Sequence, residues 1–232
     1  MKKLYEFYES ALDSKGFYNH LAQRIKDNPG LYNEQLLLVP PTYNTDKGNV
    51  DITVKKGDSR FDMPLAIGNS SAEERILILG LEPRHTNDFF NIMRVGDKVF
   101  AAPFGIDRWY AASGKKNIYG TAFADFLNSN RVFLFSDFVK EYEVNFPFDK
   151  NKDDENARKN FQPFFDSKYL EILEKEISIF KPNLILGLGV GDIKKKVDKS
   201  IIEKYNINVI SHPTNGNINK TKTAMHKLLN NK

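Results

Sequence analysis

The stretch Arg75-Ile-Leu-Ile-Leu-Gly80 is a short apolar run that ends at a glycine. Such a run is typical of a strand that is buried on both faces of a parallel sheet. Similar runs follow it, separated by segments with helical spacing of apolar residues, at positions 132–135, 183–187 and 207–210. Strands that alternate with helices predict an α/β fold. We therefore expect a three-layer α/β/α domain around a central, mostly parallel four-stranded sheet.

The residues before this run follow a different pattern. Leu4, Tyr5, Tyr8 and Leu12 recur at helical spacing, whereas residues 28–73 are rich in loop-forming residues. We interpret residues 1–74 as an N-terminal extension of helices and loops that packs on the core. Residues 75–232 are then expected to form one α/β domain.

The composition excludes several classes of protein. The 232 residues include no cysteine, which rules out a disulfide scaffold, a thiol nucleophile and metal sites with cysteine ligands. No apolar run approaches the roughly 18 residues that a membrane-spanning helix needs. The N-terminal stretch MKKLYEFYES contains acids where a secretory signal is apolar. We expect a soluble, cytoplasmic monomer that needs neither a metal nor a cofactor.

Basic residues gather near the C-terminus. The net charge at pH 7 is +4, but from Ile193 onward nine lysines face only Asp198 and Glu203. This segment therefore carries +7, and the residues before it carry −3. A basic segment of this kind favours contact with a polyanion such as nucleic acid. The lysine run at 194–196 alone is more typical of a solvated helix face.

Polar side chains follow the predicted strands at the points where these end. Glu82 and His85 come after the first strand, Asp137 after the second and His212 after the last. Ligands bind outside the carboxyl ends of parallel strands, so we expect these four side chains to meet at one edge. The third strand leads into Gly187-Leu-Gly-Val-Gly191, which lacks the final glycine of a dinucleotide-binding motif.

The order of these motifs resembles that of the uracil-DNA glycosylase superfamily. Gly80-Leu-Glu-Pro-Arg-His85 is similar to the family's water-activating motif Gly-Gln-Asp-Pro-Tyr-His. Ser211-His212-Pro213-Thr214 is similar to its His-Pro-Ser motif, which precedes a loop that enters the DNA minor groove. Residues 180–189, Phe-Lys-Pro-Asn-Leu-Ile-Leu-Gly-Leu-Gly, resemble the segment around its third core strand. The resemblance runs from residue 75 to the C-terminus and does not explain the residues before it.

The resemblance implies a monofunctional DNA glycosylase of base-excision repair, which hydrolyses the N-glycosidic bond of a flipped base. Glu82 would stabilise the sugar cation and orient water, His212 would donate to the departing base, and His85 is the third candidate catalytic residue. The candidates for contact with the base are Gly80, Leu81, Phe100, Ser136 and Asp137, with Phe104 as an alternative aromatic wall. The candidates for contact with DNA are Pro213, Thr214, Asn215, Gly216, Asn217, Lys220 and Lys222.

Two departures from the family pattern leave alternatives open. Glu82 stands where the family commonly has aspartate or asparagine, and Ser136 or Asp137 stands where it often has an asparagine that reads the base. An ionised Asp137 only accepts hydrogen bonds, so it would favour a base with an amino group, such as a cytosine derivative, over uracil. The alternatives on the same fold are a non-catalytic protein that binds nucleic acid or a nucleotide, and a hydrolase of nucleosides or nucleotides.

Overall fold

The computed structural model describes residues 1–27, 38, 52, 55, 57–81, 91–108, 118–143, 168–214 and 216–230. Its helices are α1 (Lys2–Ala11), α2 (Phe17–Asp27), η1 (Pro103–Arg108), α3 (Ile118–Phe123), η2 (Ala124–Phe126), α5 (Lys168–Phe180), α6 (Val190–Lys196), α7 (Lys199–Lys204) and α8 (Ile218–Asn230). Its strands are β1 (Ser59–Asp62), β2 (Leu65–Gly68), β3 (Glu74–Gly80), β4 (Asn91–Val95), β5 (Lys98–Ala101), β6 (Arg131–Asp137), β7 (Glu141–Glu143), β8 (Leu184–Leu188) and β9 (Ile207–Ile210).

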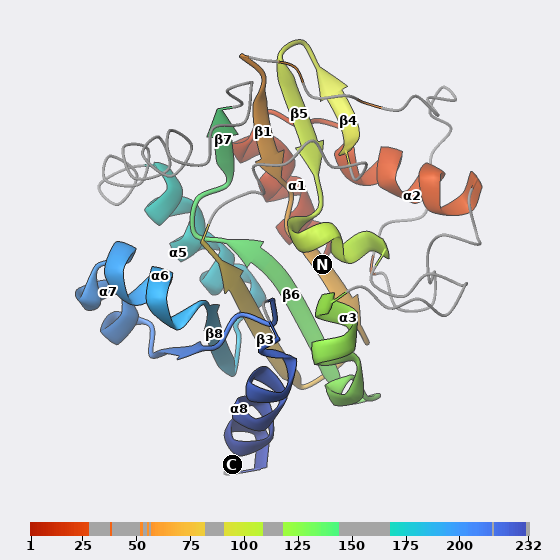
Figure 1. Ribbon diagram of the computed structural model, residues 1–232. Coiled ribbons are helices and arrows are strands. Elements are labelled where there is room, and N and C mark those ends of the chain that lie inside the picture. Colours follow the sequence, from red (N-terminus) through yellow and green to blue (C-terminus); the bar gives the residue numbers. More distant parts are fainter. Residues whose placement is uncertain are drawn as a thin grey trace.

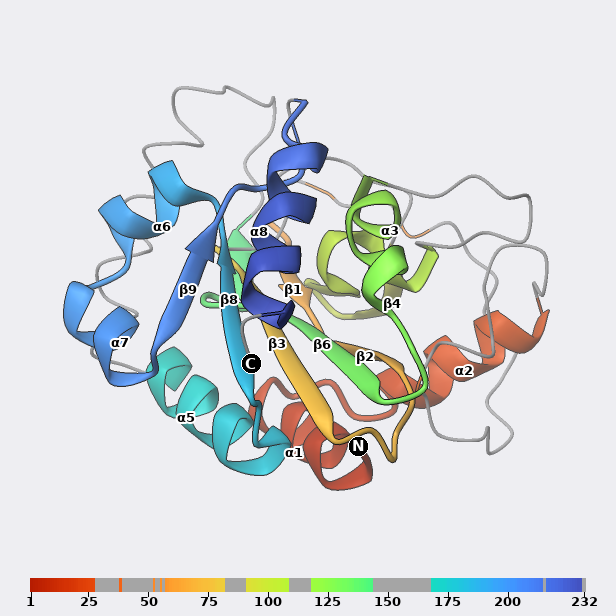
Figure 2. The same ribbon diagram turned by 90° about the horizontal axis from the view of Figure 1, so that it is seen from below.

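The four strands that the apolar runs predict lie side by side in one sheet: three of them, β6, β3 and β8, are labelled in Figure 1, and Figure 2 shows all four. Their order is β6, β3, β8 and β9, and each neighbouring pair is parallel. A fifth strand, β2, pairs antiparallel with β6 at the edge. The centre of β3, from Ile76 to Leu79, is fully buried, as expected for a strand covered on both faces. We call this the main sheet.

A second sheet has the strand order β4, β5, β1 and β7. In it β1 runs parallel to β5 and antiparallel to β7, and β4 runs antiparallel to β5. The fold is therefore α/β with two mixed sheets, and the expectation of a single four-stranded sheet is incomplete. Residues 28–73, which read as loop-rich, contain strands of both sheets, β1 and β2.

Two of the connections between the two sheets lie close together. One crossing joins β1 to β2 after Asp62, and the other joins β6 to β7 after Asp137. The backbone amide of Asp62 donates a hydrogen bond of 3.0 Å to the carbonyl oxygen of Lys140. This bond links the two crossings, so the side chains around them share one buried region.

Helices cover the main sheet in two groups. Helix α1 packs against α5, and α3 packs against α8. Figure 2 shows the first pair on one side of the main sheet and the second pair on the other. Side chains of α1 and α2, such as Tyr8 and Phe17, belong to the same hydrophobic core as the strands. A domain boundary after residue 74 stays a prediction, although β2 of the predicted extension is itself a strand of the main sheet.

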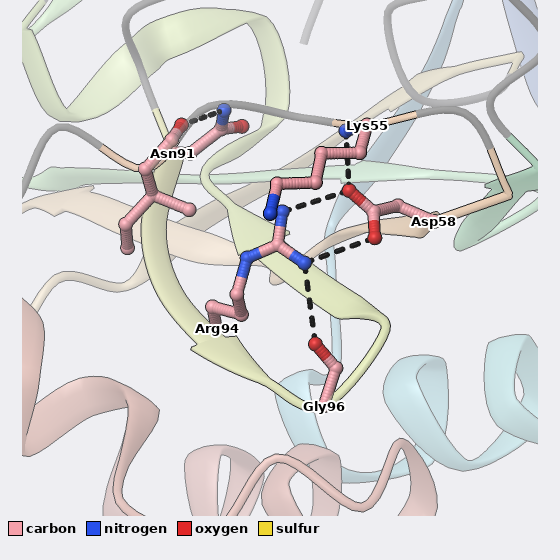
Figure 3. A network of polar contacts seen from close by, with 6 residues as sticks. Lys55, Asp58, Asn91, Arg94 and Gly96 are labelled. Atoms are coloured by element: carbon pink, nitrogen blue, oxygen red, sulfur yellow. Dashed lines mark hydrogen bonds and ion pairs between the residues drawn. The ribbon is translucent and has the colours of Figure 1, made fainter.

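An ion pair holds the segment before β1 against β4 (Figure 3). The guanidinium of Arg94 donates to both carboxylate oxygens of Asp58, over 2.9 and 2.7 Å. Hydrogen bonding to Arg94 is also the main reason that the pKa of Asp58 lies below its usual value. Because this pairing is bidentate, it fixes both the distance and the orientation of the two segments.

Helix α8 begins at Ile218, and Thr221 lies inside it, fully buried. The Thr221 hydroxyl donates to the carbonyl oxygens of Ser211, at 2.8 Å, and Asn217, at 3.1 Å. Thr221 therefore anchors the segment that precedes His212 to the helix that follows it.

Candidate functional site

The carboxyl ends of β3 and β6 meet at the expected edge of the main sheet. Gly80 is paired with Asp137, and Leu79 is paired with Ser136. Beyond the strands, the Val139 amide donates to the carbonyl oxygen of Leu81 over 3.0 Å. The structure thus brings four of the candidate base-contacting residues together: Gly80, Leu81, Ser136 and Asp137.

Three of the candidate residues lie outside the described residues. They are the two candidates of the first motif, Glu82 and His85, and one member of the last loop, Asn215. In the sequence, Glu82 comes two residues after Gly80, the last residue of β3. The roles of these three residues stay predictions.

The aromatic side chain at this edge is Phe104 and not Phe100. Phe100 is fully buried in β5, where its ring stacks on Phe61 with the centroids 5.2 Å apart. The Phe104 ring lies 4.6 Å from the ring of Tyr119 and 6.3 Å from the ring of His212. This placement favours Phe104 as the aromatic wall, the alternative that the sequence left open.

The backbone of Phe104, whose ring lies at this site, is strained. Phe104 has φ of 60° and ψ of 10°, in the left-handed region that a bulky side chain rarely adopts. Such a conformation costs of order 1–3 kcal/mol and persists only where the surroundings impose it. Strained residues of this kind concentrate at functional sites, so the strain is consistent with a binding role for this ring.

His212 is held by hydrogen bonds to both ring nitrogens. Its Nδ1 lies 2.7 Å from the Thr214 hydroxyl oxygen and 3.4 Å from the Thr214 amide nitrogen, which donates to it. Its Nε2 lies 3.1 Å from the hydroxyl oxygen of Tyr119 on α3. The last strand and its following loop therefore place His212 beside Phe104 and Tyr119, at the same edge as Gly80 and Asp137.

Gly80 is required at this edge because two side chains approach its Cα closely. A Cβ at this position would lie 2.1 Å from Oδ1 of Asp137 and 2.5 Å from Cζ of Phe104. The carboxyl group of Asp137 and the ring of Phe104 thus share the space above Gly80. No other residue type fits there without displacing one of the two.

Replacing Gly80 by alanine is expected to lower the free energy of unfolding by about 1–3 kcal/mol, because overpacked sites force neighbouring side chains off their positions. Urea denaturation measures this change. The control is Gly191→Ala in α6, where a Cβ would meet nothing within 4 Å; alanine there should be neutral or stabilising. Equal stability of the two variants would show that Asp137 and Phe104 are not packed against Gly80.

Asp137 is fully buried, and neither of its carboxyl oxygens has a hydrogen-bond donor among the described residues. Burial raises the pKa of Asp137 well above its usual value, and the nearby charge of Asp62 raises it further. The charge of Lys140 opposes this rise. Asp137 therefore keeps its proton to a higher pH than an ordinary aspartate does.

The stability of the protein should depend on pH through Asp137. The folded state holds the Asp137 proton more tightly than the unfolded state, where the pKa is about 3.9. Its contribution is therefore complete below pH 4 and is lost as the pH rises toward the raised folded-state pKa, at up to about 1.4 kcal/mol per pH unit. Asp137→Asn, which needs no proton, should gain stability relative to wild type over this range in urea titrations. A constant difference between the two proteins from pH 4 to pH 9 would contradict the assignment.

A buried polar network, which no sequence motif indicates, lies beside Asp137. Lys140 and Glu176 of α5 form an ion pair of 3.2 Å with both side chains fully buried. The Lys140 ammonium also donates to the Ser136 hydroxyl, at 2.5 Å, and to the Asp137 carbonyl oxygen. Tyr8 of α1 completes the network: burial, and next the charge of Glu176, raise the pKa of its hydroxyl. Ser136 is thus bound to Lys140 in the interior.

Some residues around His212 and Asp137 belong to the sequence motifs, such as Thr214 and Gly80, and others come from elements without a motif, such as Phe104 and Tyr119. The chain matches no protein-family model and no curated protein. Within the described ranges, no group of three or more histidine, aspartate and glutamate side chains could hold a metal ion. No described helix is long and apolar enough to cross a membrane.

The loop after His212 leads directly into α8. Pro213 is buried, Thr214 and Asn217 are partly buried, and Gly216 is exposed. The Asn217 amide donates to the carbonyl oxygen of Thr214 over 3.2 Å, which closes a turn. On α8, Lys220 is exposed, whereas Lys222 pairs with Asp125 of η2 at 2.5 Å. Lys220 is accordingly the better placed of the two lysines to meet a phosphate.

Proposed function

We propose that the protein is a monofunctional DNA glycosylase, and that the main sheet with its two groups of helices forms a three-layer α/β/α domain. The observation that carries the proposal is the position of His212. It follows the last parallel strand, it has fixed partners on both ring nitrogens, and it lies beside the strained aromatic residue Phe104. An oriented imidazole next to an aromatic ring is what removal of a base from DNA requires.

The reaction breaks the bond between the sugar C1′ and the base nitrogen, and the electron pair leaves with the base. Positive charge develops on the sugar, and water adds to C1′. The carboxylate of Glu82 is proposed to stabilise the sugar cation and to take the proton from the attacking water. His212 is proposed to stabilise the negative charge on the departing base, and the ring of Phe104 to stack on the flipped base.

The raised pKa of Asp137 changes the expectation for the base. The preference for a base with an amino group assumed an ionised carboxylate. A neutral carboxyl group offers an O–H donor and a carbonyl acceptor, so it can bond to the O4 of uracil as well as to a cytosine derivative. We therefore propose uracil or a cytosine derivative as the base, with contact requiring movement of the Phe104 ring that shares the space above Gly80.

One experiment tests the proposal. The protein is incubated with single- and double-stranded DNA that carries uracil, hypoxanthine, a thymine mismatch or a modified cytosine, and abasic sites are then cleaved by alkali. Strand cleavage by the wild type, lost in Glu82→Gln, supports a glycosylase. No cleavage on any substrate would contradict it.

A second candidate function is non-catalytic binding of nucleic acid or a nucleotide. The observation that favours it is that His212 already has a hydrogen-bond partner on each ring nitrogen within the protein. The same DNA panel separates the two candidates. A binding protein would retain the substrates, with an affinity that falls steeply as salt rises, and would release no base.

A further inference from the structure

Tyr119 is the partner of His212 on the side away from Thr214, and no sequence motif points to it. Its hydroxyl oxygen lies 3.1 Å from Nε2 of His212. The two rings are nearly perpendicular, at 88°, with centroids 5.6 Å apart. Tyr119 is only 3% exposed, whereas His212 is partly exposed. Thr214, His212 and Tyr119 thus form a continuous chain of hydrogen bonds.

The direction of this chain follows from its first member. The backbone N–H of Thr214 can only donate, so Nδ1 of His212 is an acceptor and carries no proton. The Thr214 hydroxyl, 2.7 Å from the same nitrogen, then donates to it as well. A neutral imidazole has one N–H, which must be on Nε2, and this N–H donates to the oxygen of Tyr119. The hydrogen of the Tyr119 hydroxyl therefore points away from His212.

We propose that Tyr119 is a second catalytic residue and donates the terminal hydrogen bond to the departing base. This inference rests on the proposed glycosylase function and extends it. The charge on the base develops as the glycosidic bond breaks, and a hydrogen bond from O–H to an anion is stronger than one to a neutral acceptor. Each bond in the chain polarises the next, so Thr214 and His212 strengthen the donor at Tyr119. No proton leaves Tyr119, and His212 stays neutral throughout.

The surroundings of Tyr119 hold this donor in place before the reaction. Its ring packs against Phe104 with the centroids 4.6 Å apart. It belongs to α3, which packs on α8, the helix that follows the His212 loop. A donor that is already oriented costs no reorganisation when charge develops. Because Tyr119 packs against Phe104, the residue proposed to stack on the base, Tyr119 would lie beside the bound base.

Tyr119→Phe tests the inference because it keeps the ring and removes only the hydroxyl. Loss of one preorganised donor lowers kcat by about 10²–10³-fold, and we expect that loss here with KM changed much less. The control is Tyr205→Phe, at a tyrosine whose hydroxyl bonds to Glu174 on the surface, 2.7 Å away; its kcat should equal the wild-type value. Site-specific fluorotyrosine at position 119, with a more acidic phenol, should raise kcat, which a purely structural role would not do.

Two measurements separate failure of this inference from failure of the proposed function. A wild type without activity on any DNA substrate defeats the proposed function. An active wild type with Tyr119→Phe within threefold of it defeats the inference alone. Nitrogen NMR of His212 tests the direction of the chain without any activity: we expect the proton on Nε2, and a proton on Nδ1 would overturn the assignment.

Discussion

Lys140→Met is expected to lower the free energy of unfolding by about 3–5 kcal/mol, because removal of one partner leaves a buried charge uncompensated. Lys140 and Glu176 are both fully buried, and Lys140 also donates to Ser136. The methionine would leave the Glu176 carboxylate and the Ser136 hydroxyl without their donor. Urea denaturation at neutral pH measures the change.

Two further variants sharpen this test. Lys204→Met removes an ion pair of similar length, 2.8 Å to Glu174, whose side chains are exposed; because exposed pairs contribute little, its stability should stay close to wild type. The double variant Lys140→Met with Glu176→Met should recover much of the lost stability, because an apolar pair needs no desolvation of charge. A Lys140→Met variant as stable as Lys204→Met would contradict the network.

His212→Ala is expected to lower kcat for base release by about 10²–10³-fold, because it removes the link between Thr214 and Tyr119. KM should change much less than kcat, since the interaction strengthens only as charge develops on the base. Single-turnover kinetics on the preferred DNA substrate measure the loss. His226→Ala is the matched control: His226 lies on α8, where its ring packs against Phe126, 4.7 Å away. Equal activity of the two variants would show that His212 has no role in base release.

The strands of the main sheet were predictable because they are buried on both faces. The run from Ile76 to Leu79 is apolar at every position. This pattern is typical of a strand that is buried on both faces of a sheet. The second sheet gave no such signal. Its strand β1 contains the buried charged residues Arg60 and Asp62, and it pairs with β5, residues distant in the sequence. Long-range pairing of short, partly polar strands leaves no local pattern to read.

The candidate site was predictable only where its residues follow strands. Gly80, Asp137 and His212 could be identified as candidates because they lie at or just after the carboxyl ends of β3, β6 and β9. The choice of Phe104 over Phe100 depends on a left-handed backbone conformation, which the sequence does not indicate. Tyr119 reaches the site from α3, so its role follows from tertiary packing and not from a motif.

The ionisation of Asp137 likewise could not be predicted from the sequence alone. A carboxylate at the end of a strand was expected to be ionised, as most aspartates are. Its burial and the approach of Asp62 from the second sheet, which the sequence did not reveal, raise its pKa instead. The chemistry of this residue therefore depends on how the two sheets meet.

Release of the free base tests the central claim most directly. The wild type and Glu82→Gln are incubated with single-stranded DNA that contains uracil or a modified cytosine, and small molecules are separated from the strand by chromatography. The proposed function predicts free base from the wild type, in equal amount to abasic sites in an unbroken strand, and none from Glu82→Gln. An absence of free base from every substrate, or equal release by both proteins, would contradict it.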